Sequence, residues 1–137
     1  MIVHGVALRP GRPTGLVSIH GKPIITLPGN PTACMIGFEF FARPLIQIML
    51  GTHEERPIVK AKLTRRIPST LGQRTIARVR IFEKEGQLFA DPIATSGAGL
   101  LMPMVRANGY VEIAEDVEGL EEGREVQVKL WSGVETR

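Results

Sequence analysis

The sequence predicts a two-part chain: an α/β fragment over residues 1–51, a linker over 52–57 and a small all-β, barrel-like domain over 58–137. Three observations lead to this prediction. An apolar strand runs directly into an apolar helix within the first 51 residues. A polar segment ending in proline follows the helix, as domain boundaries often do. Closely spaced strand-like stretches then fill the rest, a pattern typical of a small antiparallel barrel or sandwich.

The first part begins with short strands. Residues 2–8 and 16–27 are rich in Val, Ile, Leu and Thr and are broken by Pro-Gly and His-Gly-Lys, which predicts two or three strands with tight turns. Residues 23–27 are almost continuously apolar. Such a run is typical of a central strand in a parallel sheet that is covered on both faces.

A helix is expected to begin at Pro31. Asn30 can act as its N-cap, and proline suits the first helical position because no amide hydrogen is needed there. Pro44 should kink the helix and Gly51 should end it. Its apolar residues occupy nearly every face, and a few strands cannot cover such a helix. The first part is therefore expected to belong to a larger α/β domain or to be completed by another chain.

The second part reads as strands separated by turns. Strand-like stretches recur at residues 58–67, 74–82, 88–93, 110–114 and 125–131. Glu85-Gly86 and Glu122-Gly123 are typical turn residues between them. Ser96-Gly97-Ala98-Gly99 is expected to lead into a short helical turn with Ser96 as its cap.

Composition indicates a cytoplasmic globular protein. Hydrophobic residues make up 43% of the chain and charged residues 23%, as in ordinary soluble domains. A single cysteine, Cys34, cannot form an internal disulfide framework. The apolar run at residues 33–50 is interrupted by Glu39, Arg43 and Pro44, which favours a buried helix over a membrane span.

No metal site is predicted from the residues of this chain. His4, His20 and His53 lack the spacing and the flanking carboxylates of metal-binding motifs, and Cys34 has no cysteine companion. The sequence also has no Ser-His-Asp set, no phosphate loop and no pair of carboxylates at a strand end. No catalytic residue is therefore assigned.

The net charge favours an anionic ligand. Lys and Arg number 17 against 14 Asp and Glu, a net charge of +3. Aromatic residues make up only 5% of the chain, so there are few side chains on which the bases of a nucleic acid could stack. We expect neither a nucleic-acid partner nor a membrane.

The first candidate ligand-binding motif is Arg9-Pro10-Gly11-Arg12-Pro13. It follows a predicted strand, and α/β sheets bind ligands beyond the carboxyl ends of their strands. The prolines restrict the backbone, while Arg9 and Arg12 offer planar, permanently charged donors suited to phosphate or another oxyanion. The alternative is an ordinary basic surface turn.

The second motif is Pro28-Gly29-Asn30-Pro31, at the junction of the apolar strand and the helix. Free amide hydrogens and the helix dipole make such a junction attractive to an anion. Ordinary capping is the alternative, and it accounts for both Asn30 and Pro31.

The third motif is Ser96 with the small residues around it, together with Arg78. Small residues let the backbone approach a ligand, and the Ser96 hydroxyl could donate to a phosphate oxygen. The alternative assigns the glycines to a turn and Arg78 to a solvated strand face.

These motifs together carry a family resemblance. Residues 7–13, Leu27-Pro28-Gly29-Asn30-Pro31, Arg43-Pro44-Leu45 with Gly51, and Thr95-Ser96-Gly97 resemble the MoeA and gephyrin E-domain family in order and spacing, over residues 3–130. The resemblance implies that residues 1–51 end a MogA/MoeA-like molybdopterin-binding domain. It also implies that the remainder is a separate C-terminal β-barrel-like domain.

The resemblance implies an activity and a set of ligands. The family is that of molybdopterin molybdenumtransferases, which insert molybdate into adenylylated molybdopterin with Mg2+ and are usually dimeric. Arg9 matches a basic residue of the family's ligand site, and Pro28 and Pro31 match its loop prolines. Arg78 and Ser96 match polar residues that face the active cleft.

Two departures bear on the expected activity. Gly5 stands where relatives usually have a lysine, and the family's acidic residues for metal and molybdate belong to a preceding half that this sequence does not contain. The chain alone is therefore expected not to insert molybdate, and to need an upstream half or a second chain. The alternative is a non-catalytic module that binds an anion, a pterin or a peptide.

Overall fold

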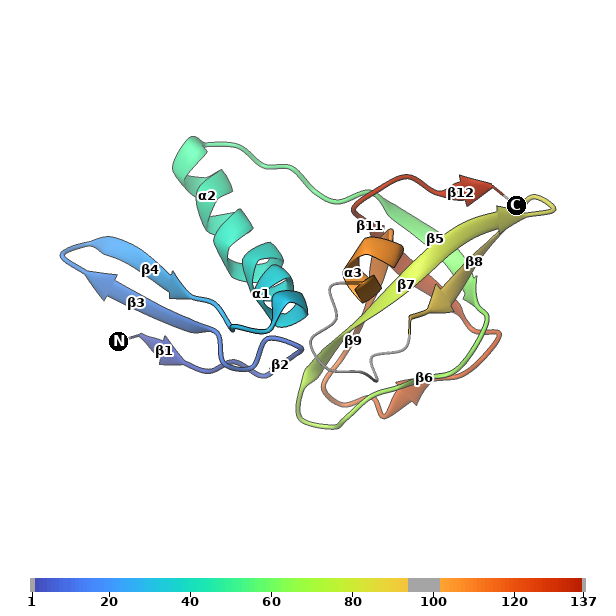
Figure 1. The fold of residues 1–137 in the computed structure, drawn as a ribbon, viewed down its shortest axis with the longest axis horizontal. Helices are drawn as coiled ribbons and strands as arrows, with labels where there is room; N and C mark the ends of the chain where they lie inside the picture. The colour runs from blue at the N-terminus through green and yellow to red at the C-terminus, as the bar shows by residue number, and fades with distance from the viewer. Residues whose placement is uncertain (1, 94–101, 137) are drawn as a thin grey trace. The chain divides into compact units, whose positions relative to one another are not determined.

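The computed structural model describes residues 2–93 and 102–136. The chain divides into two compact units, Met1–Glu55 and Arg56–Arg137 (Figure 1). The division falls within the segment that the sequence marks as a linker.

The first unit contains a three-stranded antiparallel sheet in the order β1-β3-β4. Its strands are β1 (Val3–His4), β3 (Gly15–Ile19) and β4 (Lys22–Thr26), and β2 (Leu8–Arg9) lies between β1 and β3 in the sequence. His20 and Gly21 join β3 to β4 with φ angles of 51° and 75°. Two consecutive positive φ angles match the twist of the flanking strands, so this dipeptide closes a tight hairpin.

The expectation of a central parallel strand at residues 23–27 is wrong. β4 pairs with β3 in antiparallel register, with Pro23 opposite Ser18, and lies at the end of the sheet with most of its residues exposed. Pro23 has no amide hydrogen to donate, and proline in a sheet is confined largely to edge strands. An apolar run indicates a strand, but it does not say how many neighbours the strand has.

One long helical segment follows, made of α1 (Pro31–Gly37), a π-helical turn η1 (Phe38–Ala42) and α2 (Arg43–Leu50). The predicted start is confirmed, since the Asn30 side chain accepts a hydrogen bond from the Ala33 amide at 3.1 Å. The predicted end is also confirmed, because Gly51 caps the helix with φ 65°. The kink expected at Pro44 stays a prediction. The π turn lies just before this residue, where proline cannot donate a hydrogen bond to the preceding turn.

The burial expected for this helix is found only in α1. Ile36 is fully buried, whereas no residue of α2 is buried. The 20-residue segment Pro31–Leu50 has a mean hydropathy of 1.4 and is long and apolar enough to cross a membrane by length and composition alone. This is weak support for a membrane span, because core helices of soluble proteins meet the same two conditions.

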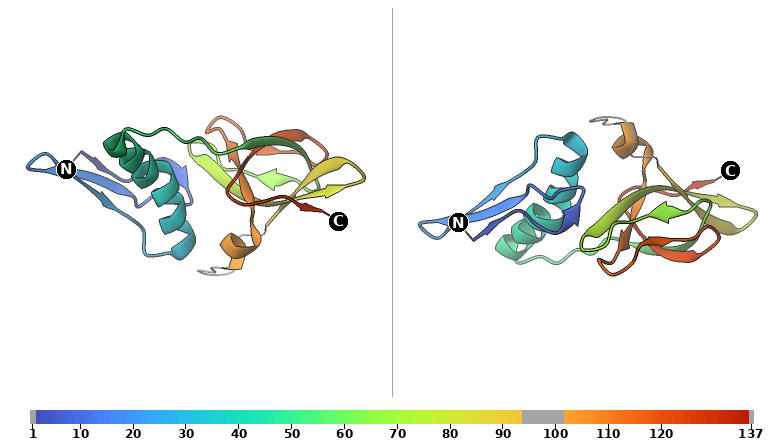
Figure 2. Two further views of the ribbon diagram at one scale, coloured as in Figure 1. Left: turned by 90° about the horizontal axis from the view of Figure 1, so that it is seen from above. Right: turned by 90° about the horizontal axis from the view of Figure 1, so that it is seen from below.

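The second unit is a closed five-stranded barrel by its strand pairing. Figure 2 shows this unit from two further sides. Around the barrel the strands are β7 (Arg74–Lys84), β8 (Gln87–Pro92), β5 (Ile58–Leu63), β11 (Glu125–Leu130) and β9 (Gly109–Ile113), and β9 pairs with β7 to close it. The remaining elements are short: β6 (Ile67–Pro68), α3 (Met102–Arg106), β10 (Gly119–Leu120) and β12 (Glu135–Thr136). The predicted barrel-like domain is confirmed.

Alternation along β7 defines the inside of the barrel. Ala77, Val79 and Ile81 belong to the buried core cluster, together with Val111 of β9 and Val128 of β11. Arg78 and Arg80 alternate with these residues and therefore lie on the outer face of the strand. The predicted turn at Glu85-Gly86 closes the β7–β8 hairpin with φ angles of 52° and 77°.

Candidate functional site

The basic turn between β2 and β3 is tightly held by hydrogen bonds. Thr14 is completely buried, and its hydroxyl donates to the Gly11 carbonyl at 2.7 Å while its amide donates to the same oxygen at 3.0 Å. The Val6 amide donates to the Arg12 carbonyl at 2.9 Å. The backbone of the turn is therefore fixed, and the Arg9 and Arg12 side chains extend from it in exposed positions.

The turn also packs against the start of the helix. Gly11 has φ 120°, and a Cβ atom added there would lie 3.3 Å from Leu8 Cδ2 and 3.8 Å from the Ala33 carbonyl oxygen. Glycine is suited to this position by both its backbone angle and its lack of a side chain. The structure thus brings the Arg9–Pro13 motif to the helix that follows Pro28-Gly29-Asn30-Pro31.

A second glycine lets the helix approach the turn. A Cβ atom added to Gly37 would lie 2.9 Å from Thr14 Oγ1 and 3.0 Å from Leu27 Cδ2. Thr14 therefore connects the two predicted motifs. Its hydroxyl donates a hydrogen bond to Gly11 and lies next to the position that a side chain on Gly37 would take. Thr14 was not predicted from the sequence, where its only signal is its position directly after the Arg9–Pro13 motif.

Capping uses the helix amides that were expected to bind an anion. Pro31 has no amide hydrogen, the Ala33 amide donates to the Asn30 side chain and the Cys34 amide donates to the Asn30 carbonyl at 2.8 Å. Gly29 is exposed and Pro28 is buried. At this junction the ordinary capping interpretation accounts for these groups, and the helix dipole is what remains to favour an anion.

Arg78 lies in β7, in the other unit. Its side chain is only 4% exposed, and neither Nε nor Nη1 has a hydrogen-bond partner among the described residues. Burial lowers the pKa of the guanidinium below its ordinary value, because a charged group loses hydration there. The solvated-face alternative for Arg78 is wrong, since the side chain is buried.

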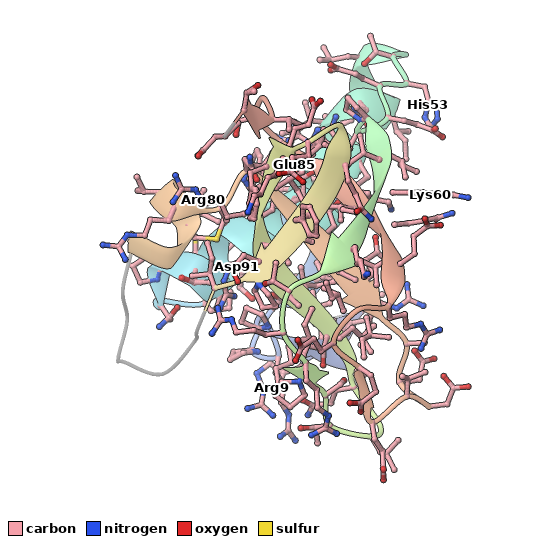
Figure 3. All side chains as sticks on the ribbon, turned by 90° about the vertical axis from the view of Figure 1, so that its right-hand side faces the viewer. Arg9, His53, Lys60, Arg80, Glu85 and Asp91 are labelled. Atoms are coloured by element: carbon pink, nitrogen blue, oxygen red, sulfur yellow. The ribbon has the colours of Figure 1, made fainter. Side chains whose placement is uncertain are left out.

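Neighbouring charges on the outer face of the barrel are paired. Arg80 donates to both carboxylate oxygens of Glu135 at 3.0 Å and lies opposite Asp91, in the hairpin whose tip is Glu85 (Figure 3). The charged hydrogen bond to Glu135 raises the pKa of Arg80. Asp91 in turn accepts from Thr64 and Arg65 at 2.5 and 3.2 Å. Arg78 differs from these residues because it is buried.

The last predicted site residue, Ser96, lies outside the described residues.

An open groove of about 580 Å3 lies on the β7–β8 hairpin. Its lining residues are Thr64, Phe82, Lys84, Glu85 and Phe89, none of which is a predicted site residue.

The part of the chain that the structure describes does not fit a divalent metal ion. Across residues 2–93 and 102–136, no group of three or more His, Cys, Asp or Glu side chains lies close enough together to hold one. Mg2+ prefers a set of oxygen ligands that includes carboxylates. These residues therefore do not form a magnesium site by themselves.

Comparison with known proteins agrees with this architecture. Residues 1–48 match the family model described as "Probable molybdopterin binding domain", and residues 60–131 match "MoeA C-terminal region (domain IV)". The two matches correspond to the two structural units. The chain thus combines a segment similar to the probable molybdopterin-binding domain with a β-barrel that matches the MoeA C-terminal region.

The relatives are substantially longer than this chain. Molybdopterin molybdenumtransferase 2 of Mycobacterium tuberculosis is 35% identical over 125 residues, which is 90% of this chain and 30% of the relative. The Bacillus subtilis molybdopterin molybdenumtransferase is 31% identical over 131 residues. The crystal structure of the MoeA molybdopterin biosynthesis protein from Pyrococcus horikoshii superimposes with a TM-score of 0.80 at 32% identity, covering 95% of this chain and 32% of that one.

These matches identify the family. The chain belongs to the MoeA family of molybdenum cofactor biosynthesis proteins and spans about 30% of the length of the curated relatives that it matches.

Proposed function

We propose that this chain forms the C-terminal part of a molybdopterin molybdenumtransferase, in which it binds the phosphate-bearing portion of adenylylated molybdopterin. The observation that carries the proposal is the fixed basic turn, with Arg9 and Arg12 exposed on a backbone that Thr14 holds against α1. Guanidinium groups suit phosphate oxygens because they present planar pairs of donors. The turn lies in the region that matches the molybdopterin-binding family model.

On this proposal the residues of this chain bind and orient the substrate but do not carry out the transfer. Pro28 and Gly29, in the same unit as the turn, are further proposed ligand contacts. In the barrel unit, Arg78 and Ser96 are proposed as ligand contacts from the family resemblance, and desolvation of Arg78 would strengthen any contact that it makes with an anion. Molybdate is the second substrate, and the ligands for Mg2+ would come from polypeptide equivalent to the rest of the relatives.

The chain alone is accordingly proposed to be inactive in molybdate insertion. The remainder of the cleft would come from an upstream segment or from a second polypeptide in the cytoplasm. Support for this comes from the relatives, which carry more than twice as much additional sequence as they share with this chain.

Binding can be tested with inorganic pyrophosphate, which resembles the linkage in an adenylylated substrate. Titration calorimetry on the 137-residue chain should show binding that Arg12→Ala weakens about tenfold, since a charged hydrogen bond contributes about 1.5–3 kcal/mol. Arg124→Ala, at an exposed position in the second unit, is the matched control and should leave affinity unchanged. Equal affinity in the Arg12→Ala variant would rule out the basic turn as the site.

Catalytic participation requires a second experiment. This chain replaces the matching 131 residues of the Bacillus subtilis relative, and molybdenum insertion is measured through the activity of a molybdenum enzyme in cells that lack their own transferase. Activity that falls with Arg9→Ala and Arg12→Ala would support the enzyme proposal. Pyrophosphate binding without any insertion would favour the non-catalytic binding module, and insertion by the 137-residue chain alone would contradict the proposed inactivity.

A further inference from the structure

Arg12 lies at the tip of a four-residue turn that Thr14 closes. The Thr14 amide donates to the Gly11 carbonyl at 3.0 Å, so Arg12 and Pro13 occupy the two central positions of the turn. Proline is disfavoured at the second central position of the commonest turn type, because it restricts the backbone of the residue before it. The residues at the tip therefore do not by themselves favour this turn, and a further interaction is expected to hold it.

The Thr14 hydroxyl supplies that interaction. It donates to the same Gly11 carbonyl oxygen at 2.7 Å, so this oxygen accepts two hydrogen bonds from one residue. The Gly11 carbonyl and the Arg12 nitrogen belong to one planar peptide group. Two donors on the carbonyl therefore fix the plane of this group, and with it the backbone from which the Arg12 side chain extends.

Only the hydroxyl depends on residue 14 being threonine. The Thr14 carbonyl accepts from the Gly5 amide at 3.0 Å, and this hydrogen bond, like the amide bond to Gly11, uses main-chain atoms that nearly any residue would provide. A variant without the hydroxyl thus keeps the main-chain hydrogen bonds of Thr14. It loses one of the two donors to the Gly11 carbonyl.

The helix shields this hydroxyl from water. Thr14 is fully buried, and a Cβ atom added to Gly37 would lie within 3 Å of Thr14 Oγ1, so α1 lies directly against the hydroxyl. Because water does not reach this group, its hydrogen bond has no competing partner. Solvent would therefore not replace the hydroxyl if it were removed.

We infer that Thr14 is a positioning residue, whose buried hydroxyl orients the Gly11–Arg12 peptide so that the Arg12 guanidinium meets a phosphate oxygen in a fixed geometry. The inference rests on the proposed function of the basic turn, and it names a residue that sets the affinity of that turn. An anion that binds a turn already fixed loses less entropy in ordering it, so the affinity is higher. Thr14 itself does not contact the anion, because its side chain is fully buried.

Titration calorimetry of the 137-residue chain with inorganic pyrophosphate measures the effect. Thr14→Val replaces the hydroxyl with a methyl group of similar size and should weaken binding about three- to tenfold, as the loss of one neutral hydrogen bond would. Thr14→Ser keeps the hydroxyl and should stay within about twofold of the native affinity. Thr52→Val, at an exposed position of the same unit, is the matched control and should bind as the native chain does.

A second pair of variants covers the case that Thr14→Val does not fold, which circular dichroism would show. Thr14→Ala and Thr14→Ser differ from each other by a single oxygen atom. The alanine variant should bind pyrophosphate about three- to tenfold more weakly than the serine variant.

A double-mutant cycle with Arg12 separates positioning from a general loss of structure. If Thr14 acts through Arg12, Thr14→Val should weaken binding by less than about twofold in an Arg12→Ala background, because residues that act as one unit are not additive. A general loosening of the unit would also weaken the contacts made by Arg9. It would therefore lower the affinity by the same factor in both backgrounds.

The outcomes distinguish this inference from the proposed function. If the native chain does not bind pyrophosphate, or if Arg12→Ala leaves binding unchanged, the proposed function is overturned together with the inference. Binding that Arg12→Ala weakens and Thr14→Val does not would overturn the inference alone. So would an equal loss from Thr14→Val in the native and Arg12→Ala backgrounds, or a Thr14→Ser variant that binds no better than Thr14→Val.

Discussion

The Asn108 side chain forms two hydrogen bonds with the backbone of Ile81. Its carbonyl oxygen accepts from the Ile81 amide at 2.6 Å, and its amide nitrogen donates to the Ile81 carbonyl at 2.8 Å. The same nitrogen also donates to the Gly133 carbonyl at 3.0 Å. One buried side chain therefore satisfies backbone groups of β7 and of the segment between β11 and β12.

Asn108→Ala is expected to destabilise the barrel unit by about 2–4 kcal/mol, because buried backbone groups lose their partners and each costs about 1–3 kcal/mol when left unsatisfied. Urea unfolding followed through Trp131 fluorescence measures the effect. Gln127→Ala, at an exposed position of β11, is the control and should change stability by less than about 0.5 kcal/mol. A loss for Asn108→Ala no larger than that of the control would contradict the prediction.

Gly37→Ala is expected to destabilise the first unit, although alanine ordinarily favours a helix over glycine by about 1 kcal/mol. The new Cβ would lie 2.9 Å from Thr14 Oγ1, and Thr14 is fully buried and hydrogen-bonded to Gly11. Overpacking of this kind costs about 1–3 kcal/mol. Hydrogen exchange of the helix amides should accelerate. Slower exchange would mean that helix propensity outweighs packing at this site.

Gly29→Ala provides the matched comparison for Gly37. No atom lies within 4 Å of a Cβ added to Gly29, and its φ is not positive. We therefore expect this substitution to leave amide exchange in α1 unchanged.

Arg78→Met is expected to stabilise the barrel unit at pH 7 and to weaken anion binding. Burial lowers the pKa of Arg78, which means that folding disfavours its charged form. At pH 7 the guanidinium is charged and therefore lowers the free energy of unfolding. Only strongly alkaline pH would remove this cost, by deprotonating the group. Replacing a desolvated charge with an apolar side chain of similar length should raise stability by about 1 kcal/mol or more. Thermal unfolding checks this prediction, and a lower Tm would show that Arg78 has a compensating partner.

Arg43→Met combined with Gln47→Leu is expected to release the segment after the helix. Both native side chains donate to the Glu54 carbonyl. Limited proteolysis should then cut between residues 51 and 57 several times faster, since cleavage follows local opening. Lys60→Met, an exposed residue of β5 whose contact with Glu125 is 3.9 Å, is the control and should leave the cleavage rate unchanged. An unchanged rate in the double variant would indicate that these hydrogen bonds do not hold the segment.

The local elements of this protein follow from short-range chemistry and could be predicted. Asn30, Pro31 and Gly51 mark the ends of the helix because capping and left-handed backbone angles depend on neighbouring residues alone. Glu85 and Gly86 mark a hairpin for the same reason. The motifs around Arg9 and Pro28 were likewise visible as a basic turn and a strand-to-helix junction.

Local patterns in the sequence therefore predicted the positions of most strands, the main turns and the long helix, and a barrel after the apolar helix. Three features became visible only in the folded chain: the antiparallel pairing of β4, the hydrogen bonds by which Thr14 holds the basic turn beside the helix, and the burial of Arg78 with two guanidinium nitrogens unpaired among the described residues. Pairing direction and burial depend on residues distant in the sequence. Composition and residue spacing describe only neighbouring positions, so they do not predict those long-range contacts.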